Sequence, residues 1–240
     1  MATNYSPAIT TDSITLCLDA NATRSYSGTG STWYDLTPNE QNGTITGATY
    51  NSNGYFDFDG NDVVGPNTFD YDDSAGAFTV CAWLNPDTFT PPVAGNSYLA
   101  VINRSDSSTH TFSVFINSTS SSNTTGDMAS WIADTGSTVR QHHASGDCIL
   151  NLNEWNFCVW RWKDGFGYTY DLFNSEGQVT ATGSSTYTIK KDSTNQFTIG
   201  RWRGTNYFYD GQMGCINFYN RKLSNAEILQ NYNAQKSRFT

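Results

Sequence analysis

Short runs of apolar and β-branched residues recur along the chain, and each is bounded by Gly, Pro, Asn, Asp or Ser. Runs of about four to eight such residues between turn residues are typical of β-strands. We therefore predict strands in SITLCLDA, GYFDFDG, AFTVCAWLNP, SYLAVINR, HTFSVFIN, MASWIAD, EWNFCVWRWK, YTYDLFN, GQVTATG, NQFTIGR and GQMGCINFY. So many short strands in one chain indicate an all-β sandwich or barrel.

The alternation within two of these runs predicts which faces are buried. AFTVCAWLNP carries apolar residues on both faces, which indicates a central strand that is covered on both sides. HTFSVFIN is expected to point one apolar face inward, made of Phe112, Val114 and Ile116. The two faces of AFTVCAWLNP are Phe78, Val80, Ala82 and Leu84 on one side and Cys81 and Trp83 on the other.

Turn residues place two hairpins and two loops. Gly supplies the positive φ that tight hairpin turns require, so we predict hairpin turns at Asp164–Gly167 and at Asn174–Gly177. The segments Ser105–Thr109 and Asn117–Gly126 are too polar to be buried and are predicted to be loops. Neither is long enough for an interdomain linker. We therefore expect a single domain over residues 1–240, with its core at about 13–235.

One helix start stands out near the end of the chain. Ser224 and Glu227 have the spacing of a capping box, and Leu223 and Ile228 that of a hydrophobic staple. These signals predict a short helix that ends near Gln235, with Ile228, Leu229 and Tyr232 on its apolar face. We expect this helix to plug an end or an edge of the sheets.

Composition and charge argue against two classes of binding partner. The chain has 240 residues, 15% of them aromatic and 15% charged, and a formal charge of −9. Its thirteen Lys and Arg form no run, so we expect no nucleic-acid partner and no membrane partner. The opening residues MATNYSPAITTDS lack the basic and apolar regions of a secretion signal. The five cysteines match no zinc spacing, which predicts free thiols and folding in a reducing cytoplasm.

Three stretches resemble a known family: LDANATRSYSGTGSTWYDL, FDFDGNDVV and DGQMGCINFYNRKLSNAEILQNYN. Over about residues 14–239 the chain is similar to the laminin-G-like, concanavalin A-like lectin/glucanase superfamily. The similarity is strongest to the single-domain versions in bacteriophage structural proteins and bacterial surface proteins. It implies an antiparallel two-sheet β-sandwich, a concanavalin A-like jelly roll, with a short C-terminal helix. It also implies carbohydrate binding or adhesion, often with a calcium ion.

Exposed aromatic rings and nearby amides are the parts that a glycan site needs, because rings stack on sugars and amides bond to hydroxyls. Trp131, Trp202 and Tyr207 are the candidates. The alternative is that these rings fill the core or an edge, as we expect of Trp83, Trp155, Trp160 and Trp162. Both interpretations stay open at the level of the sequence.

A cation site is the second candidate. Asp59, Asn61 and Asp62 offer oxygen ligands at turn spacing around Gly60, and Asp210 could approach from a neighbouring strand. In the matching turn of the family, residues of this kind are sometimes near calcium. The alternative is a tight Asx turn that caps a strand without an ion. The histidines His110, His142 and His143 are expected to be ordinary surface or strand residues.

The carboxylates argue against catalysis. Retaining glycoside hydrolysis needs two carboxyl groups about 5–5.5 Å apart. The four glutamates fall in a loop, a strand start, a hairpin turn and a helix cap, and Asp57 and Asp59 are expected to face solvent or a cation. We therefore expect a binding protein and no enzyme.

Three functions follow as hypotheses. The first is a bacteriophage virion protein, a head decoration or tail/fibre-associated subunit that folds in the host cytoplasm and leaves by lysis. Its partners would be cell-surface glycans, neighbouring virion proteins or further copies of itself in a homo-oligomer. The second is a carbohydrate-binding module that is secreted or attached to a bacterial surface. The third is a calcium-assisted glycan hydrolase or lyase.

Overall fold

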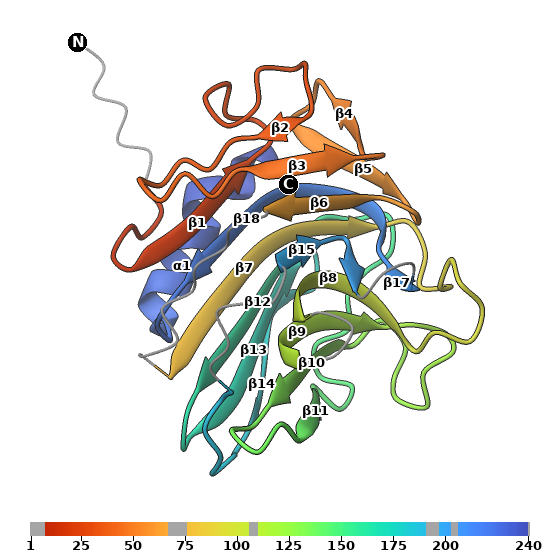
Figure 1. The fold of residues 1–240 in the computed structure, drawn as a ribbon, viewed down its shortest axis with the longest axis vertical. Helices are drawn as coiled ribbons and strands as arrows, with labels where there is room; N and C mark the ends of the chain where they lie inside the picture. Colours follow the sequence, from red (N-terminus) through yellow and green to blue (C-terminus); the bar gives the residue numbers. More distant parts are fainter. Residues whose placement is uncertain (1–7, 67–75, 106–109, 191–196, 203–205, 240) are drawn as a thin grey trace.

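The computed structural model describes residues 8–66, 76–105, 110–190, 197–202 and 206–239, and these form two large antiparallel sheets packed face to face (Figure 1). The predicted all-β sandwich with a short C-terminal helix is confirmed. All eleven predicted strands are present among the eighteen strands that the described residues form. None of the helices in the described residues is long and apolar enough to span a membrane.

In sheet A, strand β18 pairs with three other strands. The order of the sheet is β14 (Gly177–Gly183), β13 (Gly167–Asn174), β12 (Asn156–Lys163), β7 (Ala77–Pro86), β18 (Asp210–Tyr219), β5 (Tyr55–Asp59) and β4 (Thr49–Asn51), and β1 (Ile14–Asp19) also pairs with β18. The first half of β18 pairs with β5 and its second half with β1, while β7 runs along the other edge. Strands from both ends of the sequence therefore meet on β18.

Sheet B is the second layer. Its order is β11 (Val139–His143), β10 (Met128–Ala133), β9 (His110–Asn117), β8 (Tyr98–Ser105), β15 (Phe197–Ile199), β6 (Val63–Pro66), β3 (Gly43–Thr46) and β2 (Thr32–Trp33). A separate two-stranded ribbon consists of β16 (Arg201–Trp202) and β17 (Asn206–Phe208). The ribbon contacts β8, so it lies against sheet B.

The main core lies between the two sheets and follows the predicted alternation. Phe78, Val80, Ala82 and Leu84 of β7 belong to it, together with Phe112, Val114 and Ile116 of β9. Cys81 and Trp83 point to the opposite face of β7, in a second cluster with residues of the helix. The prediction that β7 is covered on both sides is therefore confirmed.

Both predicted hairpins are present. The β12–β13 turn lies between Lys163 and Gly167, and the β13–β14 turn between Asn174 and Gly177. Gly165, Gly167 and Gly177 all have positive φ. All five cysteines are free and buried. Of the predicted loop Asn117–Gly126, residues 118–126 lie in the connection from β9 to β10. Asn117 itself ends β9 and Ser105 ends β8, and both are buried, so the prediction that these segments are too polar to be buried was wrong at these two residues. Residues 106–109 lie outside the described residues.

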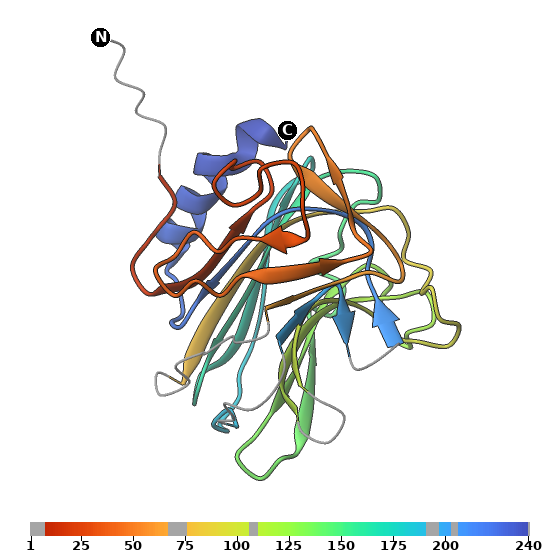
Figure 2. The same ribbon diagram turned by 45° about the horizontal axis from the view of Figure 1, so that its top comes forward.

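The helix α1 (Asn225–Gln235) begins and ends as predicted, and a 3₁₀ turn (Lys236–Arg238) follows it. Ser224 and Glu227 make both bonds of the capping box. However, α1 covers the outer face of sheet A rather than plugging an end or edge (Figure 2). Its predicted apolar face was wrong at Leu229, which is exposed.

The helix buries polar side chains in place of Leu229. The Asn231 amide accepts a hydrogen bond from Thr10 N–H at 2.7 Å and donates one to Tyr219 Oη at 3.0 Å. Gln235 Oε1 accepts a hydrogen bond from Trp83 Nε1 at 3.1 Å. Because these amides are hydrogen-bonded, they can be buried on the face of α1 that contacts sheet A. Apolar periodicity alone therefore does not identify every buried residue of the helix.

Candidate functional site on the outer face of sheet B

Three aromatic residues that are far apart in the sequence meet on the outer face of sheet B. Trp131 lies on β10, Trp202 on β16 and Tyr207 on β17. The ring centroids of Trp131 and Trp202 are 5.1 Å apart, and those of Trp202 and Tyr207 are 4.7 Å apart, both edge to face. The structure thus brings together all three predicted glycan-binding residues. Sequence reasoning missed a fourth ring, Tyr98 of β8, whose centroid is 5.1 Å from that of Trp131.

The ribbon makes this convergence possible. Gly200, between β15 and β16, has a φ of +79°, and its N–H bonds to Val101 O at 3.0 Å. A Cβ at Gly200 would lie 2.6 Å from the ring of Phe58, so only glycine fits there. The chain then folds back onto the outer face of β8 and carries Trp202 and Tyr207 to Trp131.

The four rings differ in how much surface they offer. Trp202 is only 6% exposed and Tyr98 only 4%, while Trp131 and Tyr207 are half-buried. The Trp202 ring is therefore a support for its neighbours and offers little area for stacking on a sugar. Trp131 and Tyr207 are the rings that a ligand can reach.

Tyr207 has a φ of +57°. A bulky residue in the left-handed region is uncommon and costs about 1–3 kcal/mol, so it persists only where surrounding contacts impose it. At this position the contacts are the rings of Trp202, Tyr98 and Trp131. Backbone strain of this kind clusters at ligand-binding sites.

Polar side chains adjoin the rings through the edge strand β11. Pairing of β10 with β11 sets Gln141 opposite Trp131 and His143 opposite Ala129. Tyr98 Oη donates a hydrogen bond to Gln141 Oε1 at 3.3 Å, and the His143 ring stacks on Tyr98. Asn123 Nδ2 lies 3.3 Å from His143 Nε2. The sheet B patch is defined here as Tyr98, Asn123, Trp131, Gln141, His143 and Tyr207.

A polar cavity of about 440 Å³ shares Asn123, Gln141 and His143 with the patch. Amide, hydroxyl and imidazole groups line it, and such groups can both donate hydrogen bonds to sugar hydroxyls and accept them. The residues VRQHH carry no strand signal, so the amide of Gln141 was missed. The lining residues are Ser122, Asn123, Thr124, Gln141, His142, His143, Ser145 and Tyr168.

The two adjacent histidines of β11 face opposite sides of sheet B. His142 points inward, bonds to Tyr187 Oη and packs against the rings of Trp162 and Tyr168. Burial, with smaller contributions from His143 and Arg140, lowers the pKa of His142 from 6.5 to about 4. Burial also lowers the pKa of His143. Both imidazoles are therefore neutral near pH 7.

We expect the stability of the protein to fall as the pH drops from 6.5 to about 4, partly through His142. In that window the unfolded state binds a proton at His142 that the folded state does not, so acid favours unfolding. Urea unfolding of the wild type and of His142→Gln at both ends of the window measures this contribution. The variant should lose less stability than the wild type. Equal losses in the two proteins would contradict this assignment.

The predicted calcium ligands lie together at the end of β5. Asp59 is the register partner of Asp210 on β18, and Asp62 Oδ2 accepts a hydrogen bond from Asp59 N–H at 2.9 Å. Burial raises the pKa of Asp62, and burial together with Asp87, Asp59 and Asp62 raises that of Asp210. Asn61 is exposed. The carboxylate of Asp62 thus closes the turn from within the protein.

The hydrogen bond from Asp59 N–H to the Asp62 carboxylate forms without an ion. In the described part of the chain, no three or more His, Cys, Asp or Glu side chains are gathered as a metal ion would require. Calcium binding at Asp59, Asn61, Asp62 and Asp210 stays a prediction.

The comparisons with known proteins concern the whole sandwich. A family model described as the concanavalin A-like lectin/glucanases superfamily matches residues 58–229. No curated protein matches the chain. A solved sialidase from Trypanosoma rangeli, in complex with sialic acid, is similar with a TM-score of 0.61 and 16% identity. The match covers 97% of this chain and 35% of the sialidase, so the chain spans about a third of that enzyme's length.

Two further structures are similar over most of this chain. One is domain 4 of an extracellular arabinanase from Geobacillus stearothermophilus in complex with arabinotriose, with a TM-score of 0.63 and 14% identity. The match covers 92% of this chain and 98% of that domain. The other is the receptor-binding domain of botulinum neurotoxin type G, with a TM-score of 0.60, 11% identity and coverage of 93% and 52%. At such low identity these likenesses show a shared fold.

Proposed function

Because this chain belongs to the concanavalin A-like lectin/glucanases superfamily, we propose that it is a non-catalytic glycan-binding protein and that the sheet B patch holds the sugar. The observation that carries the proposal is the convergence of accessible rings and amides from separate strands. Trp131 and Tyr207 supply ring surface, and Gln141 and Asn123 supply hydrogen-bonding groups beside them. Two of the similar structures, the sialidase and the arabinanase domain, were solved with sugars bound.

The absence of catalysis is part of the proposal. Ser175 and Asn151 donate hydrogen bonds to Glu154, lower its pKa and so keep it ionised, which is unsuitable for a general acid. Glu227 is held by Arg221 and by the cap of α1, which lower its pKa to about 2. Glu40 is exposed in a loop, and Glu176 is exposed in the β13–β14 turn. None of the four glutamates lines the polar cavity beside the patch.

A glycan array tests the proposal directly, run with calcium and again with a chelator so that the predicted calcium ligands are tested too. We expect the wild type to bind a defined set of glycans. Gln141→Ala and Trp131→Ala should each weaken binding by about tenfold or more, as truncation of a central contact does. Trp202→Ala is a poor test, because that ring is buried and its loss would disturb the ribbon.

The matched control is Gln178→Ala, which removes an exposed amide from β14 in the other sheet. Its binding should equal that of the wild type. Gln141 is also exposed, so Gln141→Ala should fold normally and its binding can be interpreted directly. The proposal fails if the wild type binds no glycan in either condition, or if Gln141→Ala and Trp131→Ala bind as tightly as the wild type.

We propose further that the protein is a subunit of a phage particle. Five free, buried cysteines support folding in a reducing cytoplasm, and an exposed patch on sheet B could face host glycans from the particle surface. None of the similar proteins reported above is a virion protein, and a module on a bacterial surface remains the alternative. Mass spectrometry of purified particles decides between them, because the protein must be present in the particle if it is a subunit.

A further inference from the structure

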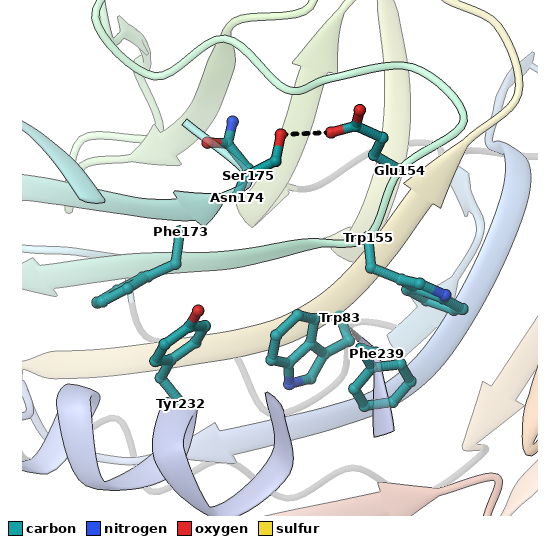
Figure 3. A pocket seen from close by; sticks show the side chains of 8 residues that line it. All are labelled: Trp83, Glu154, Trp155, Phe173, Asn174, Ser175, Tyr232 and Phe239. Atoms are coloured by element: carbon teal, nitrogen blue, oxygen red, sulfur yellow. Dashed lines mark hydrogen bonds between the residues drawn. The ribbon is translucent and has the colours of Figure 1, made fainter. Parts of the chain in front are cut away.

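A second cavity lies on the other side of the sandwich, where helix α1 leaves part of the outer face of sheet A uncovered. Its volume is about 440 Å³ and five of its lining side chains are aromatic (Figure 3). Glu154, Asn174 and Ser175 form the polar wall opposite the rings. The aromatic residues are Trp83, Trp155, Phe173, Tyr232 and Phe239. This sheet A pocket shares no residue with the sheet B patch.

The rings are fixed in place before any ligand arrives. Tyr232 of α1 stacks on Phe173 of β13 at 4.6 Å, and Phe239 stacks on Trp83 of β7 at 4.7 Å. Trp83 is fully buried, and its Nε1 bonds to Gln235. Trp155 is half-buried and packs against Phe239 at 4.7 Å. The floor of the pocket is therefore a rigid aromatic surface, and Trp155 forms its accessible flank.

Gly214 leaves the space that the Phe239 ring occupies. A Cβ at Gly214 of β18 would lie 2.3 Å from the Phe239 ring, so a larger residue would displace the ring from Trp83. Phe239 is 8% exposed and closes one end of the pocket.

One carboxylate, that of Glu154, belongs to the polar wall of the pocket. Glu154 Oε2 accepts hydrogen bonds from Ser175 Oγ at 2.7 Å and from Asn151 Nδ2 at 3.2 Å. These two bonds lower the pKa of Glu154, so it is negatively charged at neutral pH. Both bonds end on the same oxygen, which leaves Oε1 directed away from them. The pocket thus combines a negative charge with the electron-rich faces of aromatic rings.

The rings already attract cations of the chain itself. Lys236 Nζ lies 5.3 Å from the centroid of Tyr232, and Arg238 Cζ lies 4.9 Å from that of Phe239. Arg238 is also paired with Asp19 at 2.6 Å. Neither cation lines the pocket, so its interior keeps the negative charge of Glu154.

We propose that the sheet A pocket binds a small organic cation, namely a free quaternary ammonium compound with an apolar body. Aromatic faces attract such cations through the ring quadrupole, and the attraction grows when the cation is desolvated. A purely apolar ligand would make no favourable contact with the charge of Glu154. The volume falls within the usual range of small-ligand pockets.

Calorimetric titration of the full chain with choline and with 3,3-dimethylbutan-1-ol tests the charge requirement. The alcohol replaces the quaternary nitrogen by carbon and has nearly the same shape. We expect choline to bind at least about tenfold more tightly, because the cation–π and carboxylate attractions act only on the charged ligand. Equal affinity of the two compounds, or no binding of choline, would overturn the proposal.

Substitutions of pocket residues test whether choline binds in the sheet A pocket. Glu154→Gln should weaken choline binding several-fold and should fold normally, because Glu154 is exposed. Its matched control is Glu176→Gln, an exposed carboxylate on the adjacent β13–β14 turn that does not line the pocket and should leave binding unchanged. Trp155→Ala should also weaken binding. If Glu176→Gln weakens binding as much as Glu154→Gln, choline responds only to the overall negative charge and the pocket is not its site.

Gln141→Ala separates this inference from the proposed glycan binding. It should abolish or weaken glycan binding and leave choline binding intact, since Gln141 lies on the other sheet. Loss of choline binding in Gln141→Ala would contradict the assignment to the sheet A pocket. Each of the two proposals can therefore fail without the other.

Discussion

Replacing Arg161 by methionine should lower the free energy of unfolding by about 3–5 kcal/mol, since it leaves the carboxylate of Asp171 buried without its partner. The two side chains form an ion pair at 2.6 Å and are 4% and 2% exposed. Arg161 Nη1 also donates hydrogen bonds to Leu223 O at 3.0 Å and to Asn225 Oδ1 at 2.8 Å. The same substitution therefore loosens the start of α1. Urea unfolding followed by circular dichroism measures the loss.

Arg140→Met is the matched control. Arg140 pairs with Asp134 at 3.0 Å, but its side chain is half exposed, so the loss should be at most about 1 kcal/mol. The double variant Arg161→Met/Asp171→Leu should recover part of the stability, because it removes the unpaired charge. If Arg161→Met costs no more than Arg140→Met, the buried pair does not stabilise the fold as we infer.

The second large effect is expected at Trp160, which joins the two sheets. Its side chain is 1% exposed in the main core, and its Nε1 donates a hydrogen bond from β12 to Ala129 O of β10 at 3.1 Å. Trp160→Ala should cost about 3–5 kcal/mol, as removal of a fully buried large ring does. Thermal or urea unfolding gives the value.

Trp160→Phe separates packing from hydrogen bonding. It keeps most of the ring and loses the N–H donor, so we expect a smaller cost than for Trp160→Ala. Tyr34→Ala is the surface control: the Tyr34 side chain is 50% exposed and its loss should change stability by about 0.5 kcal/mol or less. A Trp160→Ala protein as stable as Tyr34→Ala would show that the sheets do not depend on this contact.

Local signals in the sequence predicted much of the fold. The alternation in β7 shows in the residues themselves, because both faces of that strand are apolar and buried. The hairpin at Gly165 and the cap at Ser224 depend on neighbours in the sequence and were also predictable. In contrast, β11 (Val139–His143) is defined by its pairing with β10, and its mostly polar sequence carries no strand signature.

The candidate site also depends partly on contacts between distant parts of the chain, which local sequence signals do not predict. The types of residue could be chosen from the sequence, since Trp131, Trp202 and Tyr207 are the rings that converge. How far each ring is exposed could not be predicted from the sequence, because the β16–β17 ribbon buries Trp202 and leaves Tyr207 accessible. The sheet A pocket was missed because Trp155 resembles the other core tryptophans until α1 is placed beside it.

The central position of β18 affects how the molecule can be made. Sheet A has its middle filled by residues 210–219, while the strands on either side of it, β7, β5 and β1, are all synthesised much earlier. Until β18 emerges from the ribosome, those strands have open edges and one half of the sandwich has no centre. Closing the sheet requires contacts between distant parts of the chain, which are slow to form. Sheet A can therefore be completed only after translation has passed Tyr219.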